Sequence, residues 1–195
     1  MAKLKLGMVG GGQGAFIGGV HRIASRIDNH YELVAGSLAS NPEMAHASAK
    51  ELGINEDRSY ATFQDMAEKE SSREDGIDVV AIVTPNHLHY SIAETFLSKN
   101  IHVICDKPLT HNLEDAEKFL ESVKKSNALF ALTHNYTGYP MVRQAREMFR
   151  NGEIGNLRII QVEYAQDWLT LPIENEGQKQ ASWRTDPSKA GMGGS

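Results

Sequence analysis

Short apolar runs alternate with amphipathic stretches over the first two thirds of the chain. Five runs have the length and apolar content of strands: 4–9, 31–38, 78–84, 101–105 and 128–133. The run over 78–84 is apolar on consecutive rather than alternate positions, which is typical of a strand covered on both faces. Strands that alternate with helices predict an α/β fold, with a parallel sheet between two layers of helices.

The helices between these runs have recognisable first residues. Asn41 precedes Pro42, which places a capping side chain before a proline at the first helical position. Thr62 and Asn112 are each followed three residues later by an aspartate, as in variants of the capping box. Apolar residues at helical spacing follow Pro85 and predict a helix that lies on the sheet: Ile92, Ala93, Phe96 and Leu97.

The chain changes character after His134. We expect one helix over 141–151 and one strand over 157–165, with glycine-containing turns between them. One strand cannot form a sheet alone. The pattern therefore predicts two parts, a complete first domain over 1–133 and the truncated beginning of an α+β second domain over 134–195.

Composition narrows the class of protein. The chain has 195 residues, with 20 Lys and Arg against 25 Asp and Glu, and a net charge of −5. A nucleic-acid-binding protein normally has a basic surplus. The single cysteine, Cys105, fits a reducing compartment, and no apolar run approaches the ~18 residues of a membrane span. We expect a soluble cytoplasmic protein that acts on a small molecule and has neither nucleic acid nor membrane as partner.

A glycine-rich segment follows the first apolar run and precedes a helical pattern. Gly10-x-Gly12-x-x-Ala15 has the spacing of a dinucleotide-binding turn, and Gly18 is an alternative third position. Glycines permit the tight turn and the close approach of the backbone, and the helix N-terminus offers free N–H groups to a pyrophosphate. The context predicts a Rossmann-type doubly wound sheet with phosphate binding here, including Gln13. The alternative is a turn with a structural role only.

The end of the second apolar run carries neither an acid nor an arginine. An acidic residue that binds the ribose is expected about twenty residues beyond the glycine loop, where the sequence reads Ala35 to Asn41. Ser37 and Ser40 are the candidates to hydrogen-bond a ribose hydroxyl or a phosphate, and the other reading is a helix-entry loop. The choice between NAD and NADP stays open.

Two polar segments end neighbouring predicted strands. The first runs Thr84-Pro85-Asn86-His87-Leu88-His89, and the second contains Asp106-Lys107-Pro108. Because parallel strands present their carboxyl ends at one edge of the sheet, we expect both segments near the glycine loop.

This pairing closely resembles the Gfo/Idh/MocA family, named for glucose–fructose oxidoreductase and inositol dehydrogenase. That family has T-P-N-x-x-H and E-K-P segments at corresponding places. Asn135-Tyr136, the turn over 152–155 and Trp183-Arg184 fit its pattern as well, so the resemblance extends from the glycine loop to Gly194. Asp106 stands where the family commonly has a glutamate, which shortens the reach of the carboxylate.

The resemblance, with the glycine loop and the two serines, implies a set of site residues. Lys107 is the catalytic candidate and also contacts substrate, with Tyr136 and Arg184. His89, Asn135, Tyr136 and Arg184 each have a purely structural alternative. We assign no role to His87 or His102, treat Cys105 as a packing residue, and expect no metal. The candidate cofactor-binding residues are Gly10, Gly12, Gln13, Ala15, Gly18, Ser37, Ser40, Thr84, Pro85, Asn86, His89, Asp106, Lys107 and Asn135.

The activity that the resemblance implies is hydride transfer between NAD or NADP and a secondary alcohol of a sugar or cyclic polyol. Lys107 would orient the hydroxyl as a cation and stabilise alkoxide character. The family's D-x-x-x-H segment, whose pair of side chains binds substrate and moves the proton, is expected beyond Ser195, with the sheet that forms the usual homo-oligomer. We therefore expect this chain alone to be catalytically inactive. The alternatives are an NAD-dependent glycosidase on the same scaffold and a non-catalytic dinucleotide-binding protein.

Overall fold

The computed structural model describes residues 2–191 and contains a five-stranded parallel sheet. The last four residues of the expected glycine stretch, 192–195, lie outside the described residues. The strand order is β2-β1-β3-β4-β5, so the direction of the winding reverses at β1 and a crevice is expected beyond the carboxyl ends of β1 and β3. The strands are β1 (Leu4–Gly10), β2 (Tyr31–Ser37), β3 (Val79–Val83), β4 (His102–Cys105) and β5 (Phe130–Leu132).

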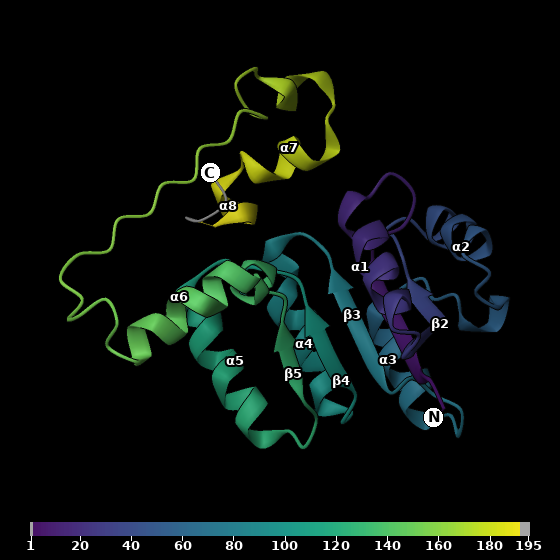
Figure 1. Ribbon diagram of the computed structural model, residues 1–195. Coiled ribbons are helices and arrows are strands. Elements are labelled where there is room, and N and C mark those ends of the chain that lie inside the picture. Colours follow the sequence, from purple (N-terminus) through teal and green to yellow (C-terminus); the bar gives the residue numbers. More distant parts are fainter. Residues whose placement is uncertain (1, 192–195) are drawn as a thin grey trace.

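Helices cover both faces of this sheet, as Figure 1 shows. The first set of helices comprises α1 (Phe16–Ile27) and α2 (Pro42–Glu51), and the second comprises α3 (Phe63–Ser72), α4 (His89–Ser98) and α5 (Leu113–Lys125). Alternate residues of β3 enter two separate hydrophobic cores: Val80 and Ile82 pack with the second set, and Val79, Ala81 and Val83 pack with the first. This arrangement confirms the predicted doubly wound α/β fold.

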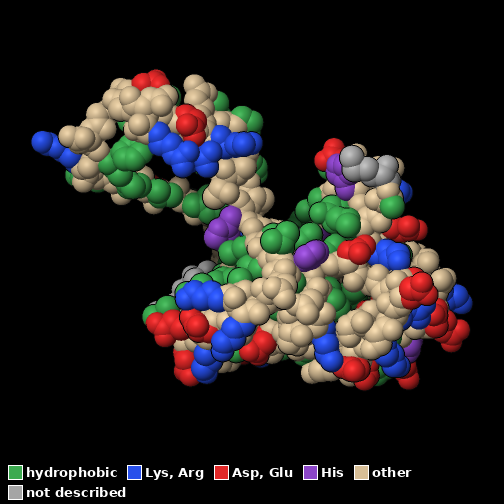
Figure 2. All heavy atoms as spheres, turned by 90° about the horizontal axis from the view of Figure 1, so that it is seen from below, with side chains coloured by type: hydrophobic (Ala, Val, Ile, Leu, Met, Phe, Trp, Pro, Cys, Tyr) green, Lys and Arg blue, Asp and Glu red, His purple; other side chains and the backbone are tan. Residues whose placement is uncertain are grey.

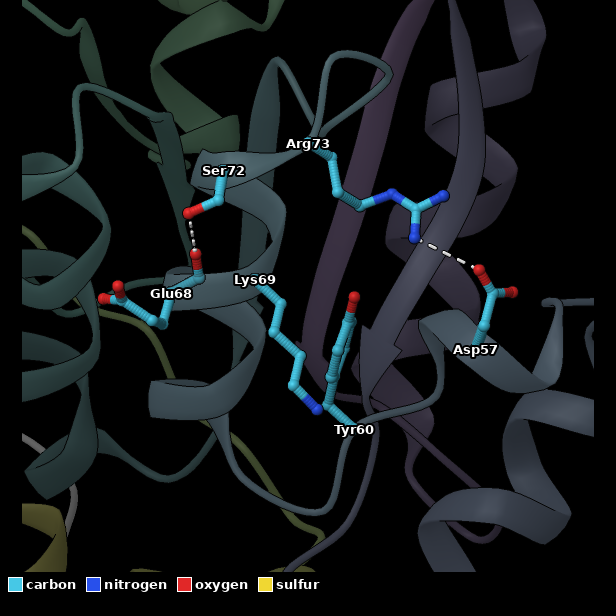
Figure 3. A pocket seen from close by; sticks show the side chains of 6 residues that line it. All are labelled: Asp57, Tyr60, Glu68, Lys69, Ser72 and Arg73. Carbon is cyan, nitrogen blue, oxygen red and sulfur yellow. Dashed lines mark hydrogen bonds and ion pairs between the residues drawn. The ribbon is translucent and has the colours of Figure 1, made fainter.

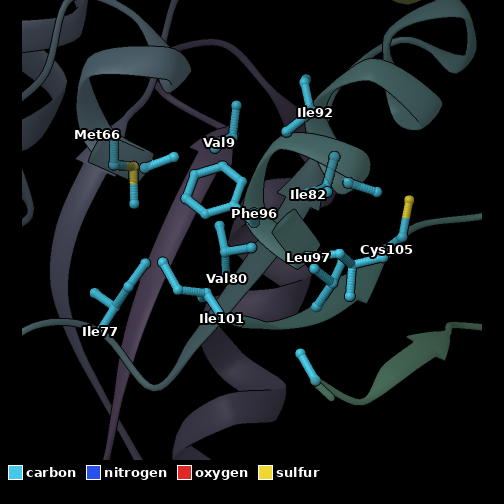
Figure 4. Packing of buried hydrophobic residues seen from close by; sticks show 14 of the residues in the cluster. Val9, Met66, Ile77, Val80, Ile82, Ile92, Phe96, Leu97, Ile101 and Cys105 are labelled. Atoms are coloured by element: carbon cyan, nitrogen blue, oxygen red, sulfur yellow. The ribbon is translucent and has the colours of Figure 1, made fainter. Parts of the chain in front are cut away.

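The larger core is centred on α4, and Figure 4 shows Phe96 among strand and helix side chains. All four apolar residues predicted to face the sheet from this helix are buried. Cys105 on β4 has an exposed fraction of 0%, and burial, followed by the negative charge of Asp106, raises the pKa of its thiol.

The three predicted helix caps are confirmed. The side chain of Asn41 accepts a hydrogen bond from the N–H of Met44 at the start of α2. In the same way, Thr62 accepts from the N–H of Asp65 at the start of α3, and Asn112 accepts from the N–H of Asp115 at the start of α5. These helix starts follow from neighbouring residues alone, which is why sequence predicts them.

The chain beyond β5 differs from the prediction. A short 3-10 turn η3 (Asn135–Gly138) and α6 (Pro140–Arg150) are followed by residues 157–167, which form no strand. The strand predicted over 157–165 is therefore wrong. An extended segment becomes a strand only by pairing its backbone, and this one faces solvent, with Ile159 84% exposed.

The chain then returns to the sheet, a second departure from the expected single helix and strand. The returning segment comprises η4 (Ile173–Glu176), α7 (Lys179–Arg184) and α8 (Pro187–Ala190). Figure 1 shows these elements in yellow, above the carboxyl ends of the strands. Helix α8 contacts η2 (Asn86–Leu88), the turn that directly follows β3.

Apolar side chains are exposed on α6 and on the segment 157–167, among them Met141, Val142, Ile160 and Val162. Figure 2 shows a projecting lobe on which hydrophobic and Lys or Arg side chains lie side by side. Within residues 2–191, none of the helices has the length and apolarity needed to span a membrane.

Candidate functional site

The site lies at the carboxyl edge of the sheet, where the glycine loop, the Thr84–His89 segment and the Asp106–Pro108 segment follow β1, β3 and β4. The register of the ladder sets Gly10 opposite Val83, and Ile82 opposite Cys105. The structure therefore brings together the three segments that the sequence analysis singled out.

The N-terminus of α1 is left open by the protein. Ala15 occupies the capping position, no side chain accepts from the first turn, and that turn has no acidic residue. Side chains cap α2, α3 and α5, whereas α4 and α6 also begin without a side-chain cap. Unpaired N–H groups and the positive end of the helix dipole suit an anion such as a pyrophosphate. A hollow of about 320 Å³ borders this end and is lined by Gly11, Gly12, Gln13, Gly14, Ala15, Phe16, Arg22, Ser48, Glu51 and Leu52.

Close packing identifies Gly18 as the third glycine of the loop. A Cβ at Gly18 would lie 2.6 Å from the carbonyl oxygen of Gly11 and 2.9 Å from its carbonyl carbon. A Cβ at Gly12 would lie 2.7 Å from the carbonyl oxygen of Leu38. Helix α1 thus packs on the loop through Gly18, whereas Ala15 already carries a side chain at the start of the helix.

Side chains of two helices fix the glycine loop. The N–H of Gln13 donates to Oγ of Ser48 at 3.0 Å, and its Nε2 donates to Oε2 of Glu51 at 2.9 Å. Arg22 donates through Nη1 to the carbonyl oxygen of Gly11 at 2.7 Å. Burial is the largest effect on Arg22, and it lowers the pKa of the guanidinium. Sequence reasoning missed Arg22, Ser48 and Glu51, although Arg22 lies one helical turn after Gly18.

The two candidate ribose residues lie next to the glycine loop. Ser37 is the last residue of β2 and is buried, and Ser40 is exposed before α2. The N–H of Gly12 donates to the carbonyl oxygen of Leu38 at 3.0 Å, which joins the two loops. The predicted positions therefore meet in space.

In the segment after β3, the side chain of Asn86 is hydrogen-bonded, whereas Oγ1 of Thr84 and Nδ1 of His87 are buried without a partner among the described residues. Asn86 is buried and donates through Nδ2 to the carbonyl oxygen of Ala190 at 2.8 Å. Oγ1 of Thr84 is buried and has no hydrogen-bond partner among residues 2–191. A buried hydroxyl without a partner costs free energy, so Thr84 has hydrogen-bonding capacity left for a ligand. Pro85 precedes Asn86 at the start of η2.

His89 begins α4 behind this segment. Its Nδ1 lies 2.7 Å from the carbonyl oxygen of Pro108, and its Nε2 lies 3.0 Å from that of Thr84. Burial is the largest effect on the ring and lowers the pKa of His89.

The segment after β4 holds a carboxylate and an exposed lysine. Asp106 accepts a hydrogen bond from Oγ1 of Thr133 at 2.8 Å, and Nε2 of His21 on α1 lies 3.7 Å from the same carboxylate oxygen. Burial alone would raise the pKa of Asp106, but His21 and Thr133 together lower it below its ordinary value. Lys107 is exposed, and its peptide bond with Pro108 is cis. No sequence pattern indicated His21, because the two partners lie far apart in the chain.

The later part of the chain contributes aromatic side chains. Tyr136, on η3, has its hydroxyl 3.0 Å from that of Tyr164, and the neighbouring Asn135 is exposed. The guanidinium of Arg184 lies 5.1 Å from the ring centroid of Trp183 and 5.7 Å from that of Trp168.

Burial and one carboxylate shift the pKa of Arg184 in opposite directions. Burial, the largest effect, lowers the pKa of Arg184, and the negative charge of Asp106 raises it. Arg184 therefore lies within the electrostatic field of the segment that carries Lys107.

A second hollow, of about 350 Å³, lies beside the C-terminal half of α3 (Figure 3). Arg73 there pairs with Asp57 at 3.1 Å and with Asp75 at 2.7 Å, and Lys69 lies 5.7 Å from the centroid of the Tyr60 ring. None of the candidate site residues lines it. In the described part of the chain, no three His, Cys, Asp or Glu side chains gather as metal ligands.

Comparisons with known proteins agree with this geometry. The chain is 60% identical to an oxidoreductase from Sinorhizobium meliloti of known crystal structure, with a TM-score of 0.83 over 87% of this chain and 47% of that chain. It is 36% identical to an inositol dehydrogenase homologue from Azotobacter vinelandii in complex with NAD⁺, with a TM-score of 0.90 over 97% of this chain and 48% of that chain. It is 30% identical to levoglucosan dehydrogenase from Pseudarthrobacter phenanthrenivorans, over 99% of this chain and 47% of the relative.

The chain thus spans about half the length of the curated relatives it matches. The family described as an oxidoreductase family with an NAD-binding Rossmann fold matches residues 4–134, which include the glycine loop, Asn86 and Lys107. The chain belongs to the Gfo/Idh/MocA oxidoreductase family.

Proposed function

We propose that this chain forms the cofactor-binding part of an NAD(H)-dependent dehydrogenase that acts on a secondary alcohol of a sugar or cyclic polyol. The observation that carries the proposal is the open N-terminus of α1 beside the glycine loop, at the same sheet edge as Lys107. Family membership, and the NAD⁺ bound to the Azotobacter homologue, support it.

The residues present fit a dinucleotide. Gly12 and Gly18 pack so closely on Leu38 and Gly11 that a Cβ would clash, which holds the start of α1 against the loop, and Oγ1 of Thr84 has no partner among the described residues. We assign the pyrophosphate to the glycine loop and the start of α1. We assign the adenosine ribose to Ser37 and Ser40, and the nicotinamide end to the segments after β3 and β4. Asn135 would border the nicotinamide from the second part of the chain.

We infer the preference between NAD and NADP from the charged residues near the end of β2. The end of β2 leads into Ser37-Leu38-Ala39-Ser40-Asn41, which contains no cation. A 2′-phosphate is recognised through a nearby arginine, whereas serine hydroxyls can hydrogen-bond a free 2′-hydroxyl. The nearby Arg22 is engaged with the carbonyl oxygen of Gly11. We therefore assign NAD rather than NADP.

The mechanism assigns one reactive role to this chain. The nicotinamide, when bound, supplies or accepts the hydride. The ammonium group of Lys107 would donate a hydrogen bond to the substrate hydroxyl, orient it and stabilise negative charge on that oxygen as the hydroxyl proton passes to a separate general base of the intact enzyme. Tyr136 and Arg184 contact the substrate from the second part of the chain, over 134–195. The first part, over 1–133, carries the cofactor site.

The names of two relatives support the substrate class. One is an inositol dehydrogenase homologue, and the other is levoglucosan dehydrogenase. Cyclic polyols and sugars share a ring that carries several secondary hydroxyls. We propose a substrate from this class, and a homo-oligomeric complete enzyme.

A thermal-shift experiment with NAD, NADH, NADP and NADPH tests cofactor binding by the chain. A cofactor at 100 times its dissociation constant adds about 2.7 kcal/mol. That raises Tm by roughly 5 to 11 °C in a chain of this size. NAD and NADH should shift Tm more than their phosphorylated counterparts. A folded sample that responds to none of the four would refute the proposal.

Turnover is tested by following NADH absorbance in the intact enzyme that contains these residues, with inositols, levoglucosan and hexoses. Lys107→Met should lower kcat by about 10²–10³-fold and leave the cofactor thermal shift unchanged. Lys124→Met is the matched control, because Lys124 is exposed on α5 and pairs only with Glu121 among the described ion pairs. Equal turnover in both variants would remove Lys107 from the mechanism.

A further inference from the structure

The ring of His89 joins the two segments that carry the candidate nicotinamide site. Its exposed fraction is 1%, so it has no contact with a ligand in the crevice. Its two nitrogens lie 2.7 Å from the carbonyl oxygen of Pro108 and 3.0 Å from that of Thr84. Both partners are acceptors, so the neutral ring donates a hydrogen bond to one of them, and only the protonated ring donates to both. These carbonyl groups belong to different segments, one after β4 and one after β3.

Each of the two carbonyl groups is adjacent to a candidate site residue. Pro108 directly follows Lys107, and Thr84 lies two residues before Asn86. The separation between Lys107 and Asn86 depends on how these two segments are held, because β3 and β4 pair only up to Ile82 and Cys105. Beyond that last pair, Asp106 donates one backbone hydrogen bond to Ile82, at 2.9 Å. His89 adds a connection beyond the end of the ladder.

We propose that His89 is a positioning residue, which sets the distance between Asn86 and Lys107 by bridging the carbonyl groups of Thr84 and Pro108 with its ring, which donates a hydrogen bond to at least one of them. This inference rests on the proposed function, since it concerns the nicotinamide end of the cofactor site. It predicts a specific defect. Loss of the bridge affects binding of the nicotinamide riboside and leaves the distant glycine loop unchanged.

The test compares affinity for NAD with affinity for ADP, which lacks the nicotinamide and its ribose. Calorimetry on the chain gives the ratio of the dissociation constant for ADP to that for NAD. His89→Phe keeps a planar ring of similar volume and removes both polar contacts. The ratio should fall by roughly two- to tenfold, the effect of losing a hydrogen bond, while ADP affinity stays unchanged.

Two amide variants test the hydrogen bonds themselves. The nitrogen of Asn lies near the position of Nδ1 and that of Gln near Nε2, so His89→Asn keeps the contact with Pro108 and His89→Gln the contact with Thr84. At least one of them should restore part of the ratio. Failure of both, with the ratio lowered in the Phe variant, would show that ring shape matters rather than the bridge, and would overturn the proposal.

Glu70→Gln is the control for a general loss of stability. Glu70 pairs with Arg58 and accepts from the N–H of Ile77, just before β3, at the sheet edge opposite the candidate site. It should lower Tm without changing the ratio. If wild type binds neither NAD nor ADP, the proposed function is refuted. If wild type binds both and His89→Phe keeps the same ratio, the role of His89 alone is refuted.

Discussion

The contact between Gly18 and Gly11 sets the position of α1 on the glycine loop, and a single methyl group should disturb it. In Gly18→Ala the new Cβ would lie 2.6 Å from the carbonyl oxygen of Gly11, whereas ordinary contact begins at 3.4 Å. The Cα of Gly11 would lie closer still, so helix and loop must separate by about 1 Å, a shift of the kind that follows overpacking of a tight contact. We expect a loss of about 1–3 kcal/mol, which lowers Tm by roughly 2 to 12 °C.

The same displacement should weaken cofactor binding, because the N–H groups at the start of α1 move away from the pyrophosphate. One lost hydrogen bond to a charged group lowers NAD affinity by roughly tenfold or more. Differential scanning calorimetry and NAD titration measure both effects.

Gly19→Ala is the matched control, with a Cβ whose nearest neighbour is Nη2 of Arg22 at 3.9 Å. Alanine should stabilise this helical position by about 0.5–1 kcal/mol. If Gly18→Ala were as stable as Gly19→Ala and bound NAD equally well, the assignment of Gly18 as the close-packed glycine would be wrong.

Three further predictions concern stability and the returning segment. Glu70→Gln leaves the buried guanidinium of Arg58 with only the exposed carboxylate of Asp75, at 3.8 Å, and should cost roughly 3 kcal/mol in urea unfolding; an unchanged midpoint would contradict this. Hydrogen bonds, the largest from Ser188, lower the pKa of Asp186 to about 2, so its stabilisation of α8 is complete above about pH 4 and is lost as the pH falls towards 2. NMR titration of the α8 amides checks that window, and a midpoint near the ordinary aspartate value would refute it. In Gly191→Ala the Cβ would lie 2.9 Å from the carbonyl carbon of His111, so α8 should detach from this position. The fluorescence anisotropy of the two tryptophans should then fall, and unchanged anisotropy would argue against the contact.

The parts of the fold that sequence predicted are those that neighbouring residues determine. The caps at Asn41, Thr62 and Asn112 each involve a hydrogen bond within three residues. The consecutive apolar residues of β3 had one explanation, burial on both faces, and the two cores confirm it. These features carry their cause within a short window.

The parts that sequence did not predict depend on contacts between distant segments. Residues 157–165 have the side chains of a strand, but a strand also needs a backbone partner, and the described chain supplies none. Ala15 and Gly18 both fitted the spacing of the third glycine, and only the approach of Gly18 to Gly11 distinguishes them. His21 lies near Asp106 because α1 and β4 meet in space.

The buried thiol of Cys105 gives the protein an internal reporter of unfolding. It is the single cysteine of the chain, has an exposed fraction of 0%, and lies on β4 between β3 and β5. Because burial raises its pKa, the folded state holds it as a thiol, which does not attack alkylating reagents. Modification therefore requires the core between the sheet and helices α4 and α5 to open. The alkylation rate, read by intact mass, measures how often this core opens, and a bound ligand that stabilises the fold should slow it.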